Sequence, residues 1–132
     1  MKKNTILWAD DDTDDLQMMR EILVKNHQEF NIVEVGNGKD ALGFLEQALH
    51  SDLLPSLIIL DINMPVLGGK ETLATIKAKE EFKTIPVVVF TTSDSDLDRR
   101  FCEKYNTQMI TKPPSYNKLE TTIFKVLGFA KA

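Results

Sequence analysis

Four short, mostly apolar runs in the chain each end beside a polar side chain that chemistry could use. Residues 6–9 lead into Asp10 and Asp11, residues 57–60 into Asp61, residues 87–90 into Thr91, and residues 109–111 into Lys112. Such a run is typical of a strand buried on both faces, and these strands form parallel sheets covered by helices. Because ligands bind beyond the carboxyl ends of such strands, we expect three carboxylates, a hydroxyl and an ammonium group to converge at one rim of one sheet.

Patterns with helical spacing separate these runs. The first predicted helix begins with Thr13 as its N-cap, and Asp14 and Asp15 complement its positive end. Its apolar face repeats through Leu16, Met19, Ile22 and Leu23. A further strand over residues 32–35 ends at Gly36, Asn37 and Gly38. Helical spacing then follows at Ala41, Phe44, Leu45 and Ala48.

The second half of the chain continues this alternation. Pro55 marks the entry to the third strand, and residues 65–69 break the chain before a helix that carries Leu73 and Ile76. The helix predicted around Leu97 and Phe101 has few apolar positions. The last helix has Ser115 as its N-cap, followed by Tyr116, Leu119, Ile123, Val126 and Leu127. The alternation predicts an α/β fold with a doubly wound parallel sheet. We expect one domain over residues 1–132, with a core of about residues 4–128.

The composition is that of an ordinary globular domain. Of 132 residues, 42% are hydrophobic and 27% are charged, and the net charge of −4 argues against nucleic acid or a membrane as the main partner. The single cysteine, Cys102, excludes an internal disulfide, and we expect it to be a small apolar side chain on a helix. No apolar run approaches the length of a signal peptide core or a membrane helix, so we expect a cytoplasmic protein.

The acidic residues are the first candidates for a functional site. Asp10 and Asp11 adjoin Asp61 only if the first and third strands are neighbours, as right-handed crossovers permit. Carboxylates that lie so near to one another repel each other, so that either one takes up a proton or a cation binds among them. Oxygen ligands with retained waters suit Mg²⁺ better than zinc or copper. A surface-charge interpretation fits Asp12, Asp14 and Asp15, but fits Asp61 poorly because four aliphatic residues precede it.

A phosphoryl group would explain the remaining polar residues. A carboxylate beside a bound metal can attack phosphorus and form an aspartyl phosphate, a transfer that needs mainly alignment and charge neutralisation. Mg²⁺, Lys112 and the Thr91 hydroxyl could each meet one phosphoryl oxygen. Alone, a strand-end threonine and a lysine before two prolines have ordinary explanations. Together with the acids at two other strand ends, they indicate phosphoryl transfer.

In their order along the chain, these residues resemble the receiver domain of two-component response regulators. The matching segments are residues 6–12, residues 60–65 with Gly69, residues 90–93 and residues 111–113. No single segment is decisive, but the ordered set covers essentially the whole chain. The resemblance implies a stand-alone receiver with a flavodoxin-like (CheY-like) fold of five parallel strands, in the order 2-1-3-4-5, and five helices.

The resemblance also implies roles for the acids. Asp61 would be the phosphoacceptor. Asp11 and Asp61 would be direct Mg²⁺ ligands, and Asn63 would offer its main-chain carbonyl. Asp10 would act largely through metal-bound water.

Further roles concern phosphate binding and switching. Thr91 resembles the switch hydroxyl that moves toward the phosphoryl group, and Lys112 resembles the phosphate-binding lysine. The bond from Lys112 to Pro113 is often cis in this family, which X–Pro bonds permit. Met109 stands where many members carry an aromatic residue that swings inward on activation. This departure concerns the output face around the fourth helix and fifth strand, and not the acid pocket.

We therefore expect a phosphorylation-dependent signalling switch of a two-component phosphorelay. It would accept its phosphoryl group from a sensor histidine kinase or a histidine phosphotransfer protein. It would catalyse only its own phosphorylation and dephosphorylation, and would otherwise not be an enzyme. Its output would pass to an unknown downstream protein target through the fourth and fifth helices and the strand between them.

Two other classes of protein stay open. A phosphatase of the haloacid dehalogenase type also uses a strand-end aspartate and Mg²⁺. Its Asp-x-Asp-x-Thr/Val signature is met only in part here, since Asp14 takes the last position. A phosphorylation-independent binding module on the same fold is the second alternative, and it would not need the intact set of Asp10, Asp11, Asp61, Thr91 and Lys112.

Three further residues have simple expected places. His27 and His50 fall near predicted helix ends, where we expect solvated side chains without a phosphate-carrying role. We expect Trp8 in the core, near enough to the acid pocket for its fluorescence to report Mg²⁺ binding.

Overall fold

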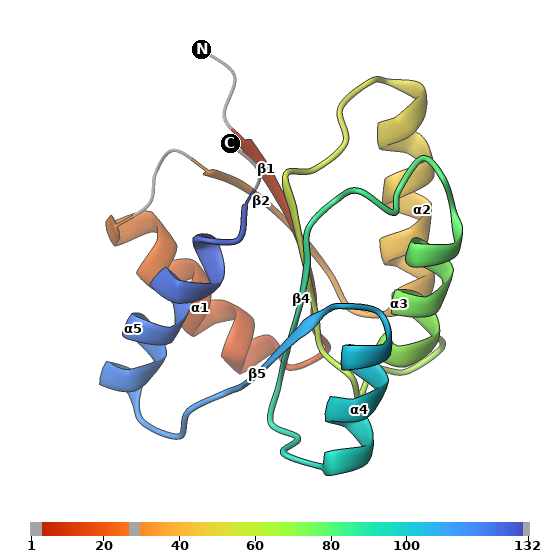
Figure 1. Ribbon diagram of the computed structural model, residues 1–132. Helices are drawn as coiled ribbons and strands as arrows, with labels where there is room; N and C mark the ends of the chain where they lie inside the picture. The colour runs from red at the N-terminus through yellow and green to blue at the C-terminus, as the bar shows by residue number, and fades with distance from the viewer. Residues whose placement is uncertain (1–3, 27–29, 131–132) are drawn as a thin grey trace.

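Five strands form one sheet with helices on both of its faces (Figure 1). The structure is a computed structural model that describes residues 4–26 and 30–130. The strands are β1 (Asn4–Ala9), β2 (Phe30–Val35), β3 (Leu57–Leu60), β4 (Val87–Thr91) and β5 (Gln108–Thr111). The helices are α1 (Thr13–Asn26), α2 (Gly38–His50), α3 (Gly69–Ala78), α4 (Asp96–Lys104) and α5 (Tyr116–Leu127).

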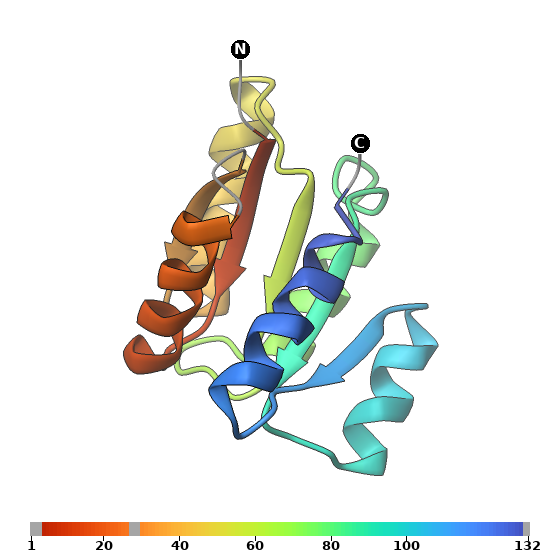
Figure 2. The same ribbon diagram turned by 90° about the vertical axis from the view of Figure 1, so that its left-hand side faces the viewer.

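The sheet has the order β2-β1-β3-β4-β5, and all neighbouring strands are parallel. This confirms the predicted doubly wound α/β fold and its strand order. α1 and α5 lie side by side over one face of the sheet, and α2, α3 and α4 cover the other (Figures 1 and 2). From β1 the chain continues to β2 on one side, whereas from β3 it continues to β4 and β5 on the other side. The crevice beyond the carboxyl ends of β1 and β3, where the strand order reverses, is therefore the expected place for a ligand.

The apolar strands supply a core on each side of the sheet. Ile6 and Trp8 of β1 pack in one cluster with α1 and α5, whereas Leu7 and Ala9 pack in the other with α2, α3 and α4. All four residues of β3 and all five of β4 are buried. Burial on both faces explains why these strands carry continuous apolar runs and not an alternating pattern. The expectation that Trp8 lies in the core is confirmed, since it is 1% exposed.

The helix starts correct one prediction and confirm others. The N-cap of α1 is Asp12 and not Thr13, because the Asp12 Oδ1 atom accepts the main-chain N–H groups of Asp14 and Asp15, both at 3.1 Å. Thr13 is instead the first helical residue. A carboxylate at the N-cap also complements the positive end of the helix, which a hydroxyl does not. Ser115 caps α5 as predicted, accepting the N–H of Lys118 at 3.4 Å.

Two elements differ in detail from their sequence patterns. β2 begins at Phe30, two residues before the predicted strand, because Phe30 and Asn31 extend the pairing with β1. The predicted α4 is present, but Leu97 is 72% exposed and does not contribute to its buried face. Cys102 is the buried residue of α4, as expected for a small apolar side chain.

His50 is the exposed last residue of α2, as expected, whereas His27 lies outside the described residues. Within the described parts of the chain, no helix has both the length and the apolar character needed to cross a bilayer.

α2 approaches the loop that follows β3 closely at Gly38. The Gly38 N–H donates to the Leu67 carbonyl at 2.9 Å. A Cβ atom at Gly38 would lie 1.9 Å from Thr72 Oγ1 and 2.6 Å from the Leu67 oxygen. The same hydroxyl donates to the Gly68 carbonyl at 2.7 Å, so it has little freedom to move away. This contact needs a residue without a side chain.

Replacing Gly38 by alanine should therefore lower the free energy of unfolding by about 1–3 kcal/mol, because the added methyl group overpacks the contact. Gly43 lies on the same helix, and a Cβ atom there would meet nothing within 4 Å, so Gly43→Ala is the matched control. That substitution should raise the free energy of unfolding by roughly 0.5–1 kcal/mol through helix propensity. Urea unfolding of both variants measures these changes, and a stabilised Gly38→Ala protein would contradict the packing described.

Candidate functional site

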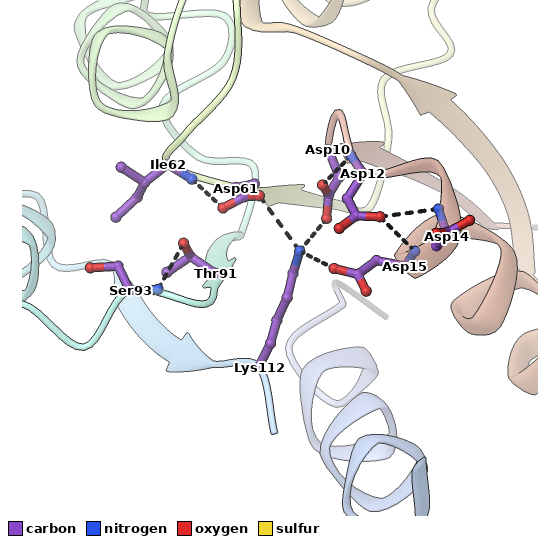
Figure 3. Close-up of polar contacts among 9 residues, drawn as sticks. All are labelled: Asp10, Asp12, Asp14, Asp15, Asp61, Ile62, Thr91, Ser93 and Lys112. Carbon is purple, nitrogen blue, oxygen red and sulfur yellow. Dashed lines mark hydrogen bonds and ion pairs between the residues drawn. The ribbon is translucent and has the colours of Figure 1, made fainter. Parts of the chain in front are cut away.

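The polar groups predicted to converge do meet at one rim of the sheet. Asp10 follows β1, Asp61 follows β3, Thr91 ends β4 and Lys112 follows β5 (Figure 3). The Lys112 Nζ atom lies 2.5 Å from Asp10 Oδ2 and 3.5 Å from Asp61 Oδ2. Because β1, β3, β4 and β5 are consecutive neighbours in the sheet, the topology itself brings these distant residues together.

Three carboxylates form a group at this rim. Asp10, Asp11 and Asp61 each offer one oxygen, and these oxygens lie within 4.8 Å of one another. Asp10 and Asp61 are 1% and 8% exposed, and Asp11 is exposed. Such a set of hard oxygen donors, open to water on one side, fits a divalent cation such as Mg²⁺ or Mn²⁺.

Main-chain contacts fix the positions of the two buried acids. The N–H of Asp10 donates to the Val35 carbonyl at 3.0 Å, and its Oδ1 accepts the N–H of Asp12 at 2.9 Å. The N–H of Asp61 donates to the Ala9 carbonyl at 2.9 Å, and its Oδ1 accepts the N–H of Ile62 at 2.7 Å. The Oδ2 atoms of both acids are thereby left to face Lys112.

The loop after β3 packs directly against the main chain of Asp61. A Cβ atom at Gly69 would lie 2.0 Å from the Asp61 carbonyl oxygen, so only glycine fits there. The Gly69 N–H donates to the Ile62 carbonyl at 2.8 Å. Asn63 lies in this loop with an exposed side chain, and the role of its main-chain carbonyl as a metal ligand stays a prediction.

For both Asp10 and Lys112, burial shifts the pKa in one direction and the charge of the other residue shifts it in the opposite direction. Burial raises the pKa of Asp10 to about 6, although the hydrogen bond and charge of Lys112 oppose that rise; the charge of Asp61 adds to it. Burial alone would lower the pKa of Lys112. The hydrogen bond and charge of Asp10, together with Asp61 and Asp15, outweigh burial and raise the pKa of Lys112 above its ordinary value. Lys112 is therefore a fixed positive charge in the site.

Asp15 is a site residue that the sequence interpretation missed. Its Oδ2 atom lies 3.0 Å from Lys112 Nζ, closer than the nearest oxygen of Asp61. The surface-charge interpretation holds for Asp12 and Asp14, which are exposed, but is wrong for Asp15. Only the position of Asp15 in the sequence could have indicated this role. Asp15 falls in the first turn of the helix that follows β1, and that turn lies at the same rim as the strand ends.

The Thr91 hydroxyl belongs to a chain of contacts that leads to α4 and α3. Thr91 is fully buried, and its Oγ1 accepts the N–H of Ser93 at 3.3 Å. The Ser93 hydroxyl donates to Asp98 Oδ2 at 2.6 Å, and Asp98 Oδ1 pairs with Lys70 Nζ at 2.5 Å. The hydrogen bonds from Lys70 and Ser93 hold the pKa of Asp98 below its ordinary value. The strand-end hydroxyl is thus linked to the start of α4.

Two expectations about the neighbourhood of Lys112 have different outcomes. The peptide bond between Lys112 and Pro113 is trans and not cis, which is the form that an X–Pro bond favours by about 0.5–1 kcal/mol. Trp8 is close to the pocket as expected. It packs edge-on against Phe90, with ring centroids 6.2 Å apart, and Lys112 Nζ lies 6.0 Å from the centroid of the Phe90 ring.

Comparison with known proteins identifies the family. A family model of the response regulator receiver domain matches residues 6–124. The chain is 36% identical over 95 residues to response regulator Rcp1 of Synechocystis sp., covering 70% of this chain and 65% of that protein. It is 39% identical over 95 residues to the probable methanogenesis regulatory protein FilR2 of Methanothrix harundinacea, covering 68% of this chain and 59% of that protein. The chain belongs to the response regulator receiver domain family.

Solved structures agree with this assignment. The phosphorylated cyanobacterial phytochrome response regulator RcpA superposes with a TM-score of 0.89 at 29% identity, covering 98% of this chain and 94% of that one. The Mn²⁺-bound form of response regulator Rcp1 gives a TM-score of 0.85 at 29% identity, covering 96% and 93% of the two chains. Receiver domains are signalling domains, so the alternative of a phosphatase is not favoured. The aligned segments span less than two thirds of the sequences of Rcp1 and FilR2.

The ion pair between Lys70 and Asp98 gives a prediction about acidity. Removing the ammonium group with Lys70→Met should raise the pKa of Asp98 toward 3.8, because the charge that stabilises the carboxylate is lost. Since the pKa of Asp98 in the folded protein lies below 3.8, its ionisation stabilises the fold above that pH. This contribution disappears as the pH falls through the folded pKa. An NMR titration of the carboxyl carbon measures the change, with Lys77→Met at the other end of α3 as the control, and an unmoved pKa in Lys70→Met would contradict the pairing.

Proposed function

We propose that this receiver is a phosphorylation-controlled switch that accepts a phosphoryl group on Asp61. The observation that carries the proposal is the position of Lys112, whose ammonium group lies 3.5 Å from an oxygen of Asp61 in a largely buried site. A buried carboxylate beside both a permanently charged ammonium group and two further acids suits a reaction that delivers a highly charged group to that carboxylate.

In the proposed reaction, a carboxylate oxygen of Asp61 attacks the phosphorus of the donor. The new O–P bond forms as the bond from phosphorus to the donor breaks, and the electron pair of that bond leaves with the donor. Lys112 stabilises the charge on one phosphoryl oxygen, and the Thr91 hydroxyl donates to another. The main-chain contact from Ile62 to Asp61 Oδ1, at 2.7 Å, orients the nucleophile.

Mg²⁺ is the cofactor in this proposal. Asp10, Asp11, Asp61 and the main-chain carbonyl of Asn63 would hold it, with Asp10 acting largely through water. Bound there, the ion supplies positive charge against the phosphoryl oxygens. Two features support the assignment: the carboxylate oxygens within 4.8 Å of one another, and the Mn²⁺ bound to the similar Rcp1.

The partners follow from the same chemistry. The proposed donor is a sensor histidine kinase or a histidine phosphotransfer protein, and the protein catalyses only its own phosphorylation and dephosphorylation. Output passes to a downstream protein through α4, β5 and α5, with no nucleic acid or membrane as the main partner. In this proposal Thr91 leaves Ser93 when it engages the phosphoryl group, and the chain of contacts to Asp98 transmits that movement to α4. The single-domain organisation over residues 1–132 and a cytoplasmic location stay predictions.

Incubation with acetyl phosphate and Mg²⁺ tests the phosphorylation directly. Intact mass spectrometry should show the addition of one PO₃ group to the wild-type protein. Asp61→Asn should show none, because an amide is not a nucleophile for phosphorus. Asp94 is an exposed acid in the loop after β4, and Asp94→Asn serves as the control that should behave as the wild type. Equal mass gain in Asp61→Asn and wild type would place the phosphoryl group elsewhere and overturn the proposal.

Binding of Mg²⁺ should change the fluorescence of Trp8, since Phe90 connects this ring to Lys112 and the acids. Asp11→Asn should weaken Mg²⁺ binding by at least about ten-fold, because it removes one unit of charge at contact distance from the ion. A fluorescence titration with MgCl₂ measures both affinities. Asp94→Asn again provides the matched loss of charge, and an affinity in Asp11→Asn equal to that of this control would contradict the metal site.

A further inference from the structure

Asp15 holds Lys112 from the side opposite Asp61. The Asp15 Oδ2 atom lies 3.0 Å from Lys112 Nζ, whereas Asp61 Oδ2 lies 3.5 Å from it. Figure 3 shows the lysine side chain rising between the two acids. The side chains of Lys112 and Asp15 are 6% and 28% exposed, so this ion pair is largely shielded from water and from salt.

The position of Asp15 is fixed by the start of α1. Its N–H donates to the Asp12 Oδ1 atom at 3.1 Å, which places the residue in the first helical turn. From there its carboxylate reaches the rim of the sheet. Asp14 shares the same cap, with its N–H also 3.1 Å from Asp12 Oδ1, but its side chain is exposed. Asp15 therefore shares the first helical turn with Asp14, but it lies on the side of the helix that contacts the lysine.

Asp15 stands outside the group of acids that could hold a cation. That group consists of Asp10, Asp11 and Asp61. A cation bound to them would weaken their hold on Lys112, and Asp15 would keep its full attraction for the ammonium group. A phosphoryl group on Asp61 needs that same ammonium group. Asp15 and the phosphoryl group thus compete for one positive charge.

Lys112 is not tightly packed on the side where Asp15 lies. A hollow of about 280 Å³ lies beside Lys112 and Asp15, lined also by Met18, Met19, Thr92 and Pro113, among others. A lysine side chain is flexible and carries a point charge, so it can exchange one carboxylate for another without the fixed geometry that arginine would need.

We propose that Asp15 is a positioning residue that restrains Lys112 and thereby slows the phosphorylation of Asp61. This inference rests on the proposed function. Losing the carboxylate at residue 15 leaves the lysine with Asp10 and Asp61, so that it spends more time where the phosphoryl group arrives. Asp15 sets the rate of phosphoryl transfer without touching the reacting atoms.

The test compares Asp15→Asn, Asp15→Glu and Asp14→Asn by their rates of mass gain with acetyl phosphate at saturating Mg²⁺. Asp15→Asn should be phosphorylated about three- to ten-fold faster than the wild type. Asp14→Asn removes the same charge from the same helical turn and should stay within about two-fold of the wild type, because Asp14 does not hold the lysine. Asp15→Glu keeps the carboxylate and should restore a rate near that of the wild type.

A second background separates restraint of Lys112 from a general structural effect. In Lys112→Gln, which lacks the ammonium group, adding Asp15→Asn should produce no acceleration. A rate in Asp15→Asn equal to or below that of the wild type, or the same acceleration in the Lys112→Gln background, would overturn the inference while leaving phosphorylation of Asp61 intact.

A measurement on the unphosphorylated protein keeps the two proposals distinguishable. The NMR signal of the Lys112 ammonium nitrogen should shift in Asp15→Asn and stay unchanged in Asp14→Asn. An unchanged signal in Asp15→Asn would overturn the inference even where no phosphorylation is observed. Absence of any mass gain in the wild type, with this signal shifted, would instead refute the proposed function and leave the contact between Asp15 and Lys112 established.

Discussion

A buried ammonium group among carboxylates is the interaction around which the rim of this sheet is organised. Lys112 lies within 3.5 Å of oxygens from Asp10, Asp15 and Asp61, and its side chain is only 6% exposed. Removing charges from water is costly, and the cost is offset only when each charge has close partners. The main-chain contacts that fix Asp10 and Asp61 keep these partners in place. Losing the lysine would leave two buried acids facing each other, which is the arrangement that favours binding of a cation or a proton.

The same cluster connects the chemistry of the rim to the outer helices. Thr91 is next to Lys112 in space, because the Lys112 N–H donates to the Thr91 carbonyl at 2.7 Å. From Thr91 the contacts run through Ser93 and Asp98 to Lys70 on α3. Met109 is buried beneath α4, where many members of the family carry an aromatic residue. In this chain the polar contacts through Ser93 provide a direct physical connection between the strand-end hydroxyl and α4, independent of an aromatic side chain.

Much of the fold and of the candidate site follows from short-range patterns in the sequence. Continuous apolar runs predict buried parallel strands, and the parallel topology then places Asp10, Asp61, Thr91 and Lys112 at one rim. What escaped prediction depends on tertiary geometry. Asp15 was interpreted as a surface charge because nothing in its neighbours along the chain reveals a lysine from the other end of the molecule. β2 was predicted to begin at residue 32, but Phe30 and Asn31 extend its pairing with β1. The cap of α1 was placed one residue late because both Asp12 and Thr13 are good N-cap residues, and the structure favours the carboxylate.

The most direct test of the central claim is a crystal structure of the protein with Mg²⁺ and beryllofluoride, a mimic of the phosphoryl group. We expect the mimic on Asp61, with Lys112 Nζ and Thr91 Oγ1 both within hydrogen-bonding distance of its fluorine atoms and the bond from Ser93 to Thr91 broken. A structure with the mimic on Asp61 but with Lys112 still bound to Asp15 and Thr91 still bound to Ser93 would contradict the role of this charge cluster in phosphorylation.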